Sequence, residues 1–543
     1  MGSTLLKNGL IVDGTGSPAY RGSLLMEGEQ ISGVYREGEE LPEAGQQVDA
    51  GGSVIAPGFI DMHSHADWAM PDDGHADVLK CLVEQGVTTV IGGNCGISPA
   101  PIDPHAVADL EALASIAMIN PLDYDWRTMG EFLERIEKTR PLLNLAELVG
   151  HAAIRYSNVK TERGTMTAAE QRQCEDSIRQ SFEEGACGLS FGLGYDPGMY
   201  SPIEELEAFC AVAAEYDKTV TVHLKALSRI SPCYPLTTPR AHNELALEEM
   251  LGIARRTGVR LQLSHFIFVG RRSWPTAERC IAMVEKARAE GVDVMIDAFP
   301  YTCGNTTILA PFPYWFLEDL PTNFKKFSAR MRLRLELGIG LRLVGFVYKD
   351  FQVMDAAVPG WEGLNGLRMT DVARQWNCSP FNAMVKLAEK SKGATLMLFH
   401  SYSGDESDES VIERVLAHEL CLFETDVAIK KTGYPNPAGL GNFPRILGRY
   451  ARDKKLFSME DAVRRMTLAS ADRFGLKGIG KLEAGWAADV VLFNPDTIAD
   501  TPPVGDQPAG KPVGIESVFI NGTAVVTNGS YLPGVQPGRV LKP

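Results

Sequence analysis

The chain has 543 residues, of which 45% are hydrophobic and 22% are charged, and its formal net charge is −16. This length and composition predict a globular protein of two or three structural units, and the acidic balance argues against a nucleic-acid or acidic-membrane partner. The ten cysteines are scattered like reduced thiols. With neither a signal-peptide core nor an apolar run long enough for a transmembrane helix, we expect a cytoplasmic protein.

The two ends of the chain are predicted to be β-rich. In residues 4–55 short apolar runs alternate with turns such as Asp13-Gly14-Thr15-Gly16, and from about residue 476 this rhythm returns, with the hairpin signal Asn521-Gly522. We expect residues 1–56 and 476–543 to pair into one small β-sandwich domain, with a Pro- and Gly-rich tail on its surface.

Between these ends, after Pro57, strands alternate with helices such as 165–184, 202–215, 243–256 and 276–290. This alternation predicts an α/β fold, a (β/α)8 TIM-like barrel over residues 57–475. Residues 305–365 fit the repeat poorly and are expected to form an insertion near the barrel mouth. A (β/α)8 barrel has eight strands, but the sequence offers nine candidates, so we expect either 292–297 or 395–399 to lie outside the barrel. The nine candidate strands are 58–63, 88–93, 144–150, 186–191, 218–223, 259–264, 292–297, 395–399 and 420–425.

Residues able to bind a metal follow the apolar runs. The first run ends in His63 and His65, whose i, i+2 spacing places both imidazoles on one face of a strand. The carboxyl ends of barrel strands meet at one face, and cysteine, histidine and aspartate together suit zinc. Each residue alone is explained as well by a buried structural role, but the joint pattern favours a metal site built from His63, His65, Cys95, His223, His265 and Asp426.

A metal beside an aspartate indicates a hydrolytic reaction. The metal lowers the pKa of a water molecule and polarises a carbonyl oxygen. A carboxylate then takes the proton of the water and passes it to the leaving nitrogen. The sequence therefore predicts hydrolysis of an amide or a related acyl bond.

At this point the residues resemble the amidohydrolase superfamily and, within it, the N-acyl-D-amino-acid deacylases (D-aminoacylases). The resemblance covers most of the chain and is carried by the motifs Pro57-Gly58-Phe59-Ile60-Asp61-Met62-His63-Ser64-His65, Gly93-Asn94-Cys95-Gly96, Gly188-Leu189-Ser190-Phe191-Gly192, Leu263-Ser264-His265, Phe299-Pro300-Tyr301, Asn442-Phe443-Pro444-Arg445 and Gly485-Trp486-Ala487-Ala488-Asp489.

The resemblance implies one tight zinc (Zn2+) site held by Cys95, His223 and His265. It implies a second, weaker site formed by His63, His65 and Asp426, with Cys95 as a bridge. Asp426 would be the general acid and base. Tyr301 matches a substrate-binding tyrosine of the family, and His151 matches a recurrent family residue whose role is as well explained by structure as by substrate binding.

The sequence departs from the family where the substrate carboxylate is bound. The family lysine two residues beyond His265 is replaced by Ile267, next to Phe266, and the family His-Pro-Arg motif reads Asn436-Pro437-Ala438. Because an unpartnered buried carboxylate is strongly disfavoured, we expect a more apolar pocket and a small-molecule amide substrate without a free α-carboxylate.

Other interpretations remain open from the sequence. A cation that enters the pocket from another direction could pair with the substrate carboxylate in place of the missing lysine and arginine. The candidates are Lys225, Arg271, Arg272, Lys430 and Lys431. A second reading is a cyclic amide or lactone hydrolase, and a third is a non-catalytic metal-binding scaffold. An oligomer is compatible with the sequence.

Overall fold

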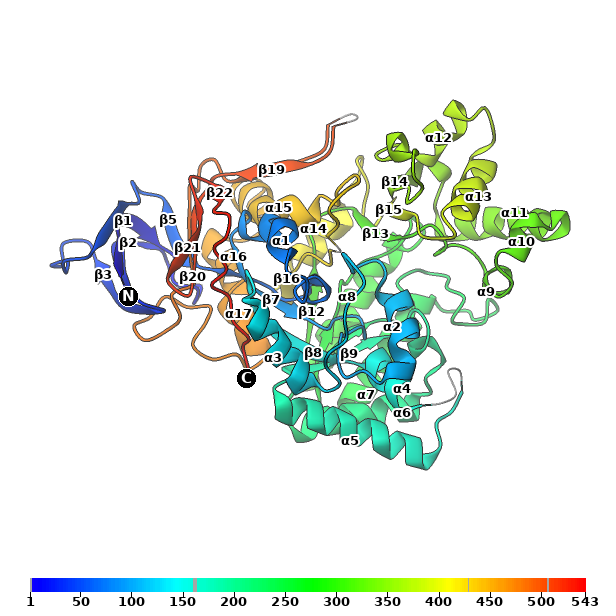
Figure 1. The fold of residues 1–543 in the computed structure, drawn as a ribbon, viewed down its shortest axis with the longest axis horizontal. Coiled ribbons are helices and arrows are strands. Elements are labelled where there is room, and N and C mark those ends of the chain that lie inside the picture. Colours follow the sequence, from blue (N-terminus) through cyan, green and yellow to red (C-terminus); the bar gives the residue numbers. More distant parts are fainter. Residues whose placement is uncertain (1, 160–163, 428, 505–506) are drawn as a thin grey trace.

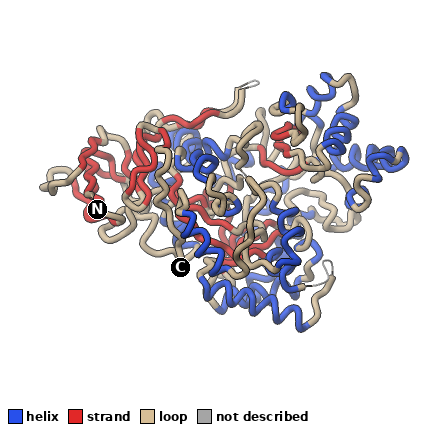
Figure 2. The backbone as a smooth tube through the Cα atoms, viewed as in Figure 1, coloured by secondary structure: helices blue, strands red, loops and turns tan. Residues whose placement is uncertain are grey.

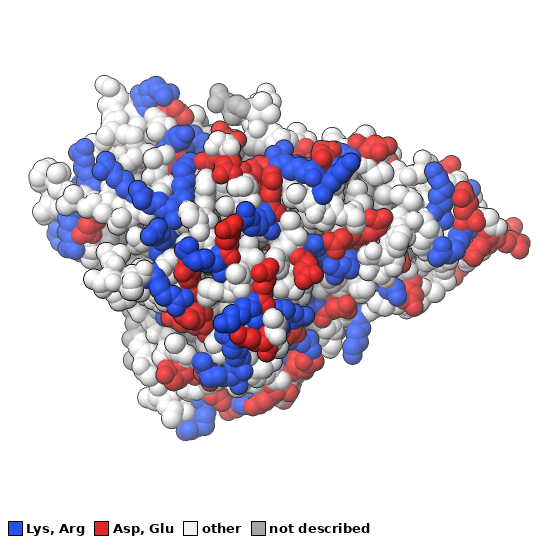
Figure 3. All heavy atoms as spheres, turned by 180° about the vertical axis from the view of Figure 1, so that it is seen from behind, with Lys and Arg blue, Asp and Glu red and all other residues white. Residues whose placement is uncertain are grey.

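The computed structural model describes residues 2–159, 164–427, 429–504 and 507–543. Figure 1 shows a β-rich part that contains the N-terminus at one end, strands surrounded by helices in the middle, and a mostly helical projection at the other end. On the face shown in Figure 3, acidic and basic side chains are interspersed. None of the helices within the described ranges is long and apolar enough to cross a membrane.

The middle of the molecule is the expected barrel. Eight parallel strands follow one another in the order β16-β12-β11-β10-β9-β8-β7-β6, and the barrel is nearly closed. Their bounds are β6 (Phe59–Asp61), β7 (Val87–Gly92), β8 (Asn144–Gly150), β9 (Gly188–Gly192), β10 (Thr219–His223), β11 (Arg260–Leu263), β12 (Val294–Ala298) and β16 (Cys421–Phe423).

Helices connect these strands and pack their apolar faces on the barrel (Figure 2). The main ones are α1 (His75–Val83), α3 (Met129–Thr139), α5 (Ala168–Glu184), α6 (Ile203–Glu215), α7 (His242–Thr257), α8 (Ala277–Ala289) and α14 (Ser410–Ala417). Local sequence sets their ends, as α5 illustrates. Thr167 and Glu170 form a capping box at its start, and Gly185, with a φ of 123°, ends it.

The expected strand at 395–399 lies outside the barrel. It is β15 (Leu396–His400), which pairs antiparallel with β13 (Cys303–Thr307) and β14 (Phe351–Asp355). The segment 303–400, hereafter the insertion, therefore extends well beyond the expected 305–365. It has its own apolar core, and its helices include α10 (Thr322–Lys325), α11 (Phe327–Val344), α12 (Met369–Gln375) and α13 (Pro380–Lys390).

The two ends of the chain form one mixed sheet, in the order β22-β21-β20-β17-β5-β1-β2-β3, with β4 beside β1. Asn521 and Gly522, with φ of 46° and 74°, form the expected hairpin turn. The N-terminal strands are β1 (Ser3–Ile11), β2 (Tyr20–Glu27), β3 (Gln30–Arg36), β4 (Gln46–Asp49) and β5 (Val54–Pro57). The C-terminal strands are β17 (Val490–Phe493), β20 (Ile515–Ile520), β21 (Thr523–Thr527) and β22 (Ser530–Tyr531).

Candidate metal centre

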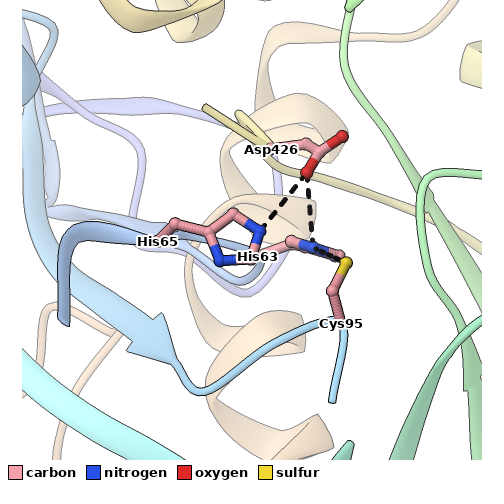
Figure 4. A group of neighbouring side chains, drawn as sticks. All are labelled: His63, His65, Cys95 and Asp426. Carbon is pink, nitrogen blue, oxygen red and sulfur yellow. Dashed lines mark hydrogen bonds and ion pairs between the residues drawn. The ribbon is translucent and has the colours of Figure 1, made fainter. Parts of the chain in front are cut away.

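A first group of ligand atoms meets where β6, β7 and β16 end (Figure 4). The Nε2 atom of His63 lies 3.3 Å from the Sγ atom of Cys95 and 3.5 Å from Oδ1 of Asp426. The Nε2 atom of His65 lies 3.7 Å from the same oxygen. Four side chains that are distant in sequence thus present donor atoms to one point.

A second group shares the cysteine. The Sγ atom of Cys95 lies 3.5 Å from Nε2 of His265 and 3.8 Å from Nδ1 of His223. All six metal-capable residues expected from the sequence are therefore brought together, in two groups that have Cys95 in common.

The backbone turns sharply at three of these residues. Cys95, His265 and Asp426 have φ values of 56°, 33° and 45°, the left-handed region that few residues other than glycine adopt. Each stands just after a barrel strand, so the turn directs its side chain over the barrel mouth. Such conformations cost about 1–3 kcal/mol each and cluster at functional sites.

Neighbouring groups hold the ligands in place. The Asp297 carboxylate accepts a 2.6 Å hydrogen bond from the backbone N–H of His265 and lies 3.7 Å from Nδ1 of His63. The Tyr195 hydroxyl donates a 2.5 Å hydrogen bond to the carbonyl oxygen of Cys95. A carboxylate behind a metal-binding histidine is a common way to orient the ring.

The charges of the cluster support ionised ligands. Burial acts to raise the pKa of Cys95, but the neighbouring His63 charge and hydrogen bonds from His223 and His265 outweigh it and hold this pKa well below its usual value. Burial also acts to raise the pKa of Asp426. The charge of His265, a hydrogen bond with His65 and the charge of His63 outweigh burial and lower this pKa. A thiolate and a carboxylate are the forms that bind zinc.

The spacing of the donors fits zinc. Bond lengths of about 2.3 Å to sulfur and about 2.0 Å to nitrogen, at a tetrahedral angle, place the two ligand atoms about 3.5 Å apart. The three distances from Cys95 Sγ to the imidazole nitrogens are 3.3, 3.5 and 3.8 Å. The donor set of one sulfur, several imidazoles and a carboxylate agrees with the same metal.

One side of the centre is apolar. Ile267 and Ala438, the positions where the family pattern has lysine and arginine, pack with Tyr301 in a single buried group, hereafter the apolar cluster (Ile267, Phe299, Tyr301, Cys303 and Ala438). The backbone N–H of Ile267 donates a 2.6 Å hydrogen bond to the carbonyl oxygen of His265, which places the cluster beside the metal-capable residues. Phe266 instead packs in the main barrel core.

Tyr301 is held at its polar end. Its hydroxyl donates a 3.0 Å hydrogen bond to Asp500, and the guanidinium of Arg445 lies 4.8 Å from its ring centroid. Arg445 also forms ion pairs with Asp500 and Glu409.

Four of the five cations proposed as replacements have other surroundings. Arg271 pairs with Asp350 and Asp405, and Lys430 donates to the carbonyl groups of Ser115 and Met118. Arg272 and Lys431 are exposed. Lys225 is half-buried, with its ammonium 5.9 Å from the ring centroid of Tyr234, and within the described ranges it has no carboxylate at ion-pair distance.

His151 is not part of either metal group. It begins α4 (His151–Asn158), and its Nε2 atom lies 2.8 Å from the carboxylate of Glu205, which also pairs with Arg155. All three side chains are buried. The contacts of His151 with Glu205, which also pairs with Arg155, explain this buried histidine by a structural role.

Three buried carboxylates at the site were missed by the sequence reasoning: Asp61, Asp297 and Glu424. Asp297 and Glu424 form a further metal-capable group with His63. Asp297 is the last residue of the expected strand 292–297, and this position at a strand end is the same signal that identified the other metal-capable residues. The other two lie inside apolar runs and resemble ordinary core-flanking positions.

Comparison with known proteins identifies the family of this chain. Two models described as the amidohydrolase family match residues 46–302 and 376–525. The chain is 31% identical to the N-acyl-D-glutamate deacylase of Alcaligenes xylosoxydans xylosoxydans, over 99% of this chain and 96% of that protein, and 29% identical to the D-aminoacylase of the same organism, over 99% and 97%.

Solved structures give the same result. The N-acyl-D-glutamate deacylase of Bordetella bronchiseptica, complexed with zinc and a phosphonate inhibitor, matches with a TM-score of 0.79 and 29% identity over the whole of both chains. A D-aminoacylase matches with the same TM-score and 27% identity over the whole of both chains. The chain therefore belongs to the amidohydrolase family, among its N-acyl-D-amino-acid deacylases, and is a metal-dependent hydrolase.

Proposed function

We propose that this protein uses zinc to hydrolyse the amide bond of an N-acyl compound that lacks a free α-carboxylate. One observation carries the proposal: Ile267 and Ala438 meet Tyr301 in the apolar cluster, and the backbone N–H of Ile267 donates a 2.6 Å hydrogen bond to the carbonyl oxygen of His265. In the family pattern the positions of Ile267 and Ala438 are cationic. With aliphatic side chains at both, a substrate carboxylate would be buried without a partner, which is strongly unfavourable.

Cys95, His223 and His265 hold the tight zinc in this proposal, and His63, His65 and Asp426 form the weaker site. For a D-aminoacylase 27% identical to this chain, one-metal activation and second-metal attenuation are described. When bound, zinc polarises the acyl carbonyl group and lowers the pKa of a water molecule.

Asp426 moves the proton. Its side chain is 23% exposed, whereas those of His63 and His65 are 1% and 6% exposed, so that among these three it faces the space from which substrate arrives. Its carboxylate takes the proton of the attacking water at Oδ1 or Oδ2 and delivers it to the nitrogen that leaves. The apolar cluster excludes water from one side of the reacting bond and contacts a neutral substituent of the substrate.

The proposal is tested by acetate release from N-acetyl-D-methionine and from its neutral amide, N-acetyl-D-methioninamide, with zinc-loaded protein. The L enantiomers serve as matched controls. Faster turnover of the amide supports the proposal. Comparable turnover of the acid overturns the neutral-substrate part and makes Lys225 the first candidate for a relocated cation.

The same assay separates the other two interpretations. Ring opening of a hydantoin or a lactone by protein that releases no acetate would assign the cyclic alternative. Protein that binds zinc and hydrolyses none of these classes would favour the non-catalytic scaffold.

A further inference from the structure

Helix α11, in the part of the insertion that projects farthest in Figure 1, has a buried and an exposed apolar face. The buried face packs in the core of the insertion through Ala329, Leu333, Leu337 and Leu341. The exposed face consists of five side chains spaced four residues apart, hereafter the α11 ridge (Phe327, Met331, Leu335, Ile339 and Leu343). Phe327 is 79% exposed and Leu335 is 65% exposed, so the ridge is unused within the described chain.

A row of arginines runs beside the ridge. Arg330, Arg334 and Arg342 follow the same four-residue spacing, with Gly338 in the remaining place. Because successive residues of an α-helix lie about 100° apart, this row lies between the buried face and the ridge. Arg334 and Arg342 are exposed, and Arg330 is half-buried. The helix thus presents an apolar row and a cationic row side by side.

The charge of this segment has one sign. Residues 325–349 contain seven basic side chains and one acidic side chain. The acidic one, Glu336, is satisfied within its own chain, because its carboxylate accepts hydrogen bonds from Arg332 at 2.7 Å and from the indole N–H of Trp315 at 2.6 Å. Lys326 pairs with Asp319 at 2.9 Å. The other basic side chains have no carboxylate at ion-pair distance among the described residues: Lys325, Arg330, Arg334, Arg342 and Lys349.

These two rows together indicate the partner. Isolated exposed apolar residues are common on protein surfaces, but a continuous row of this length usually marks an interaction site. An apolar row flanked by arginine and lysine is typical of a helix that lies in the surface of a bilayer, with its cations at the lipid phosphate groups. We propose that α11 docks this protein on an anionic lipid bilayer, with the α11 ridge among the acyl chains.

The place of α11 in the fold suits a flat surface. It lies at the end of the molecule opposite the β-rich part (Figure 1), and its buried face fixes it on the core of the insertion. Val347, which is 48% exposed, continues the apolar row beyond the helix. Long arginine side chains reach from the level of such a row to the headgroups. The ridge is a convex helix face and not a groove, so it suits insertion into lipid better than capture of a peptide.

The charge of the whole chain does not decide this contact. A net charge of −16 argues against an acidic membrane for the molecule as a whole. Charges separated by more than about 8 Å are largely screened at physiological ionic strength, so the local charge of the docking helix governs its approach to a bilayer. At the end of the molecule that carries α11, the face in Figure 3 is mainly white and blue.

The test is co-sedimentation of the full-length, zinc-loaded protein with lipid vesicles. Wild-type protein should bind vesicles of phosphatidylserine and phosphatidylcholine at least about tenfold more strongly than vesicles of phosphatidylcholine alone, and added salt should weaken the binding. Leu335→Glu/Ile339→Glu should lose the binding, and Arg334→Glu/Arg342→Glu should lose the preference for phosphatidylserine. Leu236→Glu, at an exposed position outside the insertion, is the matched control and should bind like wild type. All variants should keep the melting temperature and zinc content of wild type, since the substituted side chains are exposed.

A second measurement locates the contact without a charged variant. Leu335→Trp places a fluorophore on the ridge, and the emission that it adds to that of wild type should be quenched by brominated acyl chains, whereas that of Leu236→Trp should not. Wild-type protein that stays in solution with both kinds of vesicle would overturn the proposal. So would binding that survives Leu335→Glu/Ile339→Glu, or equal binding to phosphatidylcholine alone, which would leave the arginine row without a role.

Discussion

Asp61 and Thr425 join the first and last strands of the barrel through two hydrogen bonds. The Asp61 carboxylate accepts one from the backbone N–H of Thr425 at 2.9 Å and one from its hydroxyl at 2.6 Å. Beyond them, the N–H of Asp426 donates to the carbonyl oxygen of His63 at 3.0 Å. Because β6 and β16 are not neighbours in a hydrogen-bonded ladder, these contacts set the position of Asp426 relative to His63.

Asp61→Asn should weaken this connection between the ends of β6 and β16. The amide group replaces one acceptor oxygen with a donor that faces a Thr425 donor, which should lower the free energy of unfolding by about 1–3 kcal/mol. It should also reduce kcat while zinc remains bound. Denaturant unfolding and metal analysis check both effects, and Thr425→Val, which removes only the hydroxyl bond, should have a smaller effect. An unchanged free energy of unfolding in Asp61→Asn would show that the Asp61–Thr425 hydrogen bonds do not stabilise the junction of β6 and β16.

Asp426→Asn tests the proposed proton transfer. The amide keeps the shape of the side chain but cannot accept a proton, so kcat should fall by about 10²–10⁴-fold. The fold and the tight zinc should be retained, as measured by circular dichroism and metal analysis. Asp408→Asn, at an exposed position in another loop, is the control. Full activity in Asp426→Asn would exclude the aspartate as the acid and base.

The two metal groups should differ in affinity. Cys95→Ser removes the ligand common to both groups, and the protein should retain less than one zinc per chain after dialysis against a weak chelator. His65→Ala affects only the first group (His63, His65, Cys95 and Asp426) and should leave about one zinc in the second group. Elemental analysis distinguishes the two variants. A loss of all zinc from His65→Ala would instead place the tight site in the first group.

Ile267→Lys/Ala438→Arg should shift selectivity toward acids. The two cations would enter the apolar cluster that contains Tyr301, where a carboxylate of the substrate would give them a partner. The ratio of kcat/KM for N-acetyl-D-methionine to that for its amide should rise at least about tenfold, while the free energy of unfolding falls. Ile267→Met is the control for altered packing. An unchanged ratio in a folded double variant would show that these positions do not select the substrate.

The buried Glu205 carboxylate should make the free energy of unfolding fall at acidic pH. Burial acts to raise its pKa, but the hydrogen bond with His151 and the Arg155 charge outweigh it and lower the pKa from 4.5 to about 2. Its contribution is therefore complete above the unfolded pKa and is lost as pH falls toward the folded one. Denaturant curves should show the stability gap between wild type and Glu205→Gln narrowing by roughly 2 kcal/mol near pH 3. A constant gap would contradict the shift.

The barrel and the grouping of the six metal-capable residues could be predicted because their signals are local. Each ligand stands at the end of an apolar strand, and alternation of strands with amphipathic helices indicates a parallel barrel whose strand ends meet. The ambiguity at 395–399 arose because a short apolar run does not show whether its partners are parallel or antiparallel. Only the pairing of β15 with β13 and β14 decided it.

The sequence by itself determined which metal-capable side chains reach the barrel mouth, since residue type and strand-end position fix these donors. The tertiary structure alone decided that Ile267, Ala438 and Tyr301 share one apolar cluster, and that one ridge of α11 is exposed. These features join residues far apart along the chain, or depend on which face of a helix finds a partner. Burial is a property of the packed chain, and no local pattern specifies it.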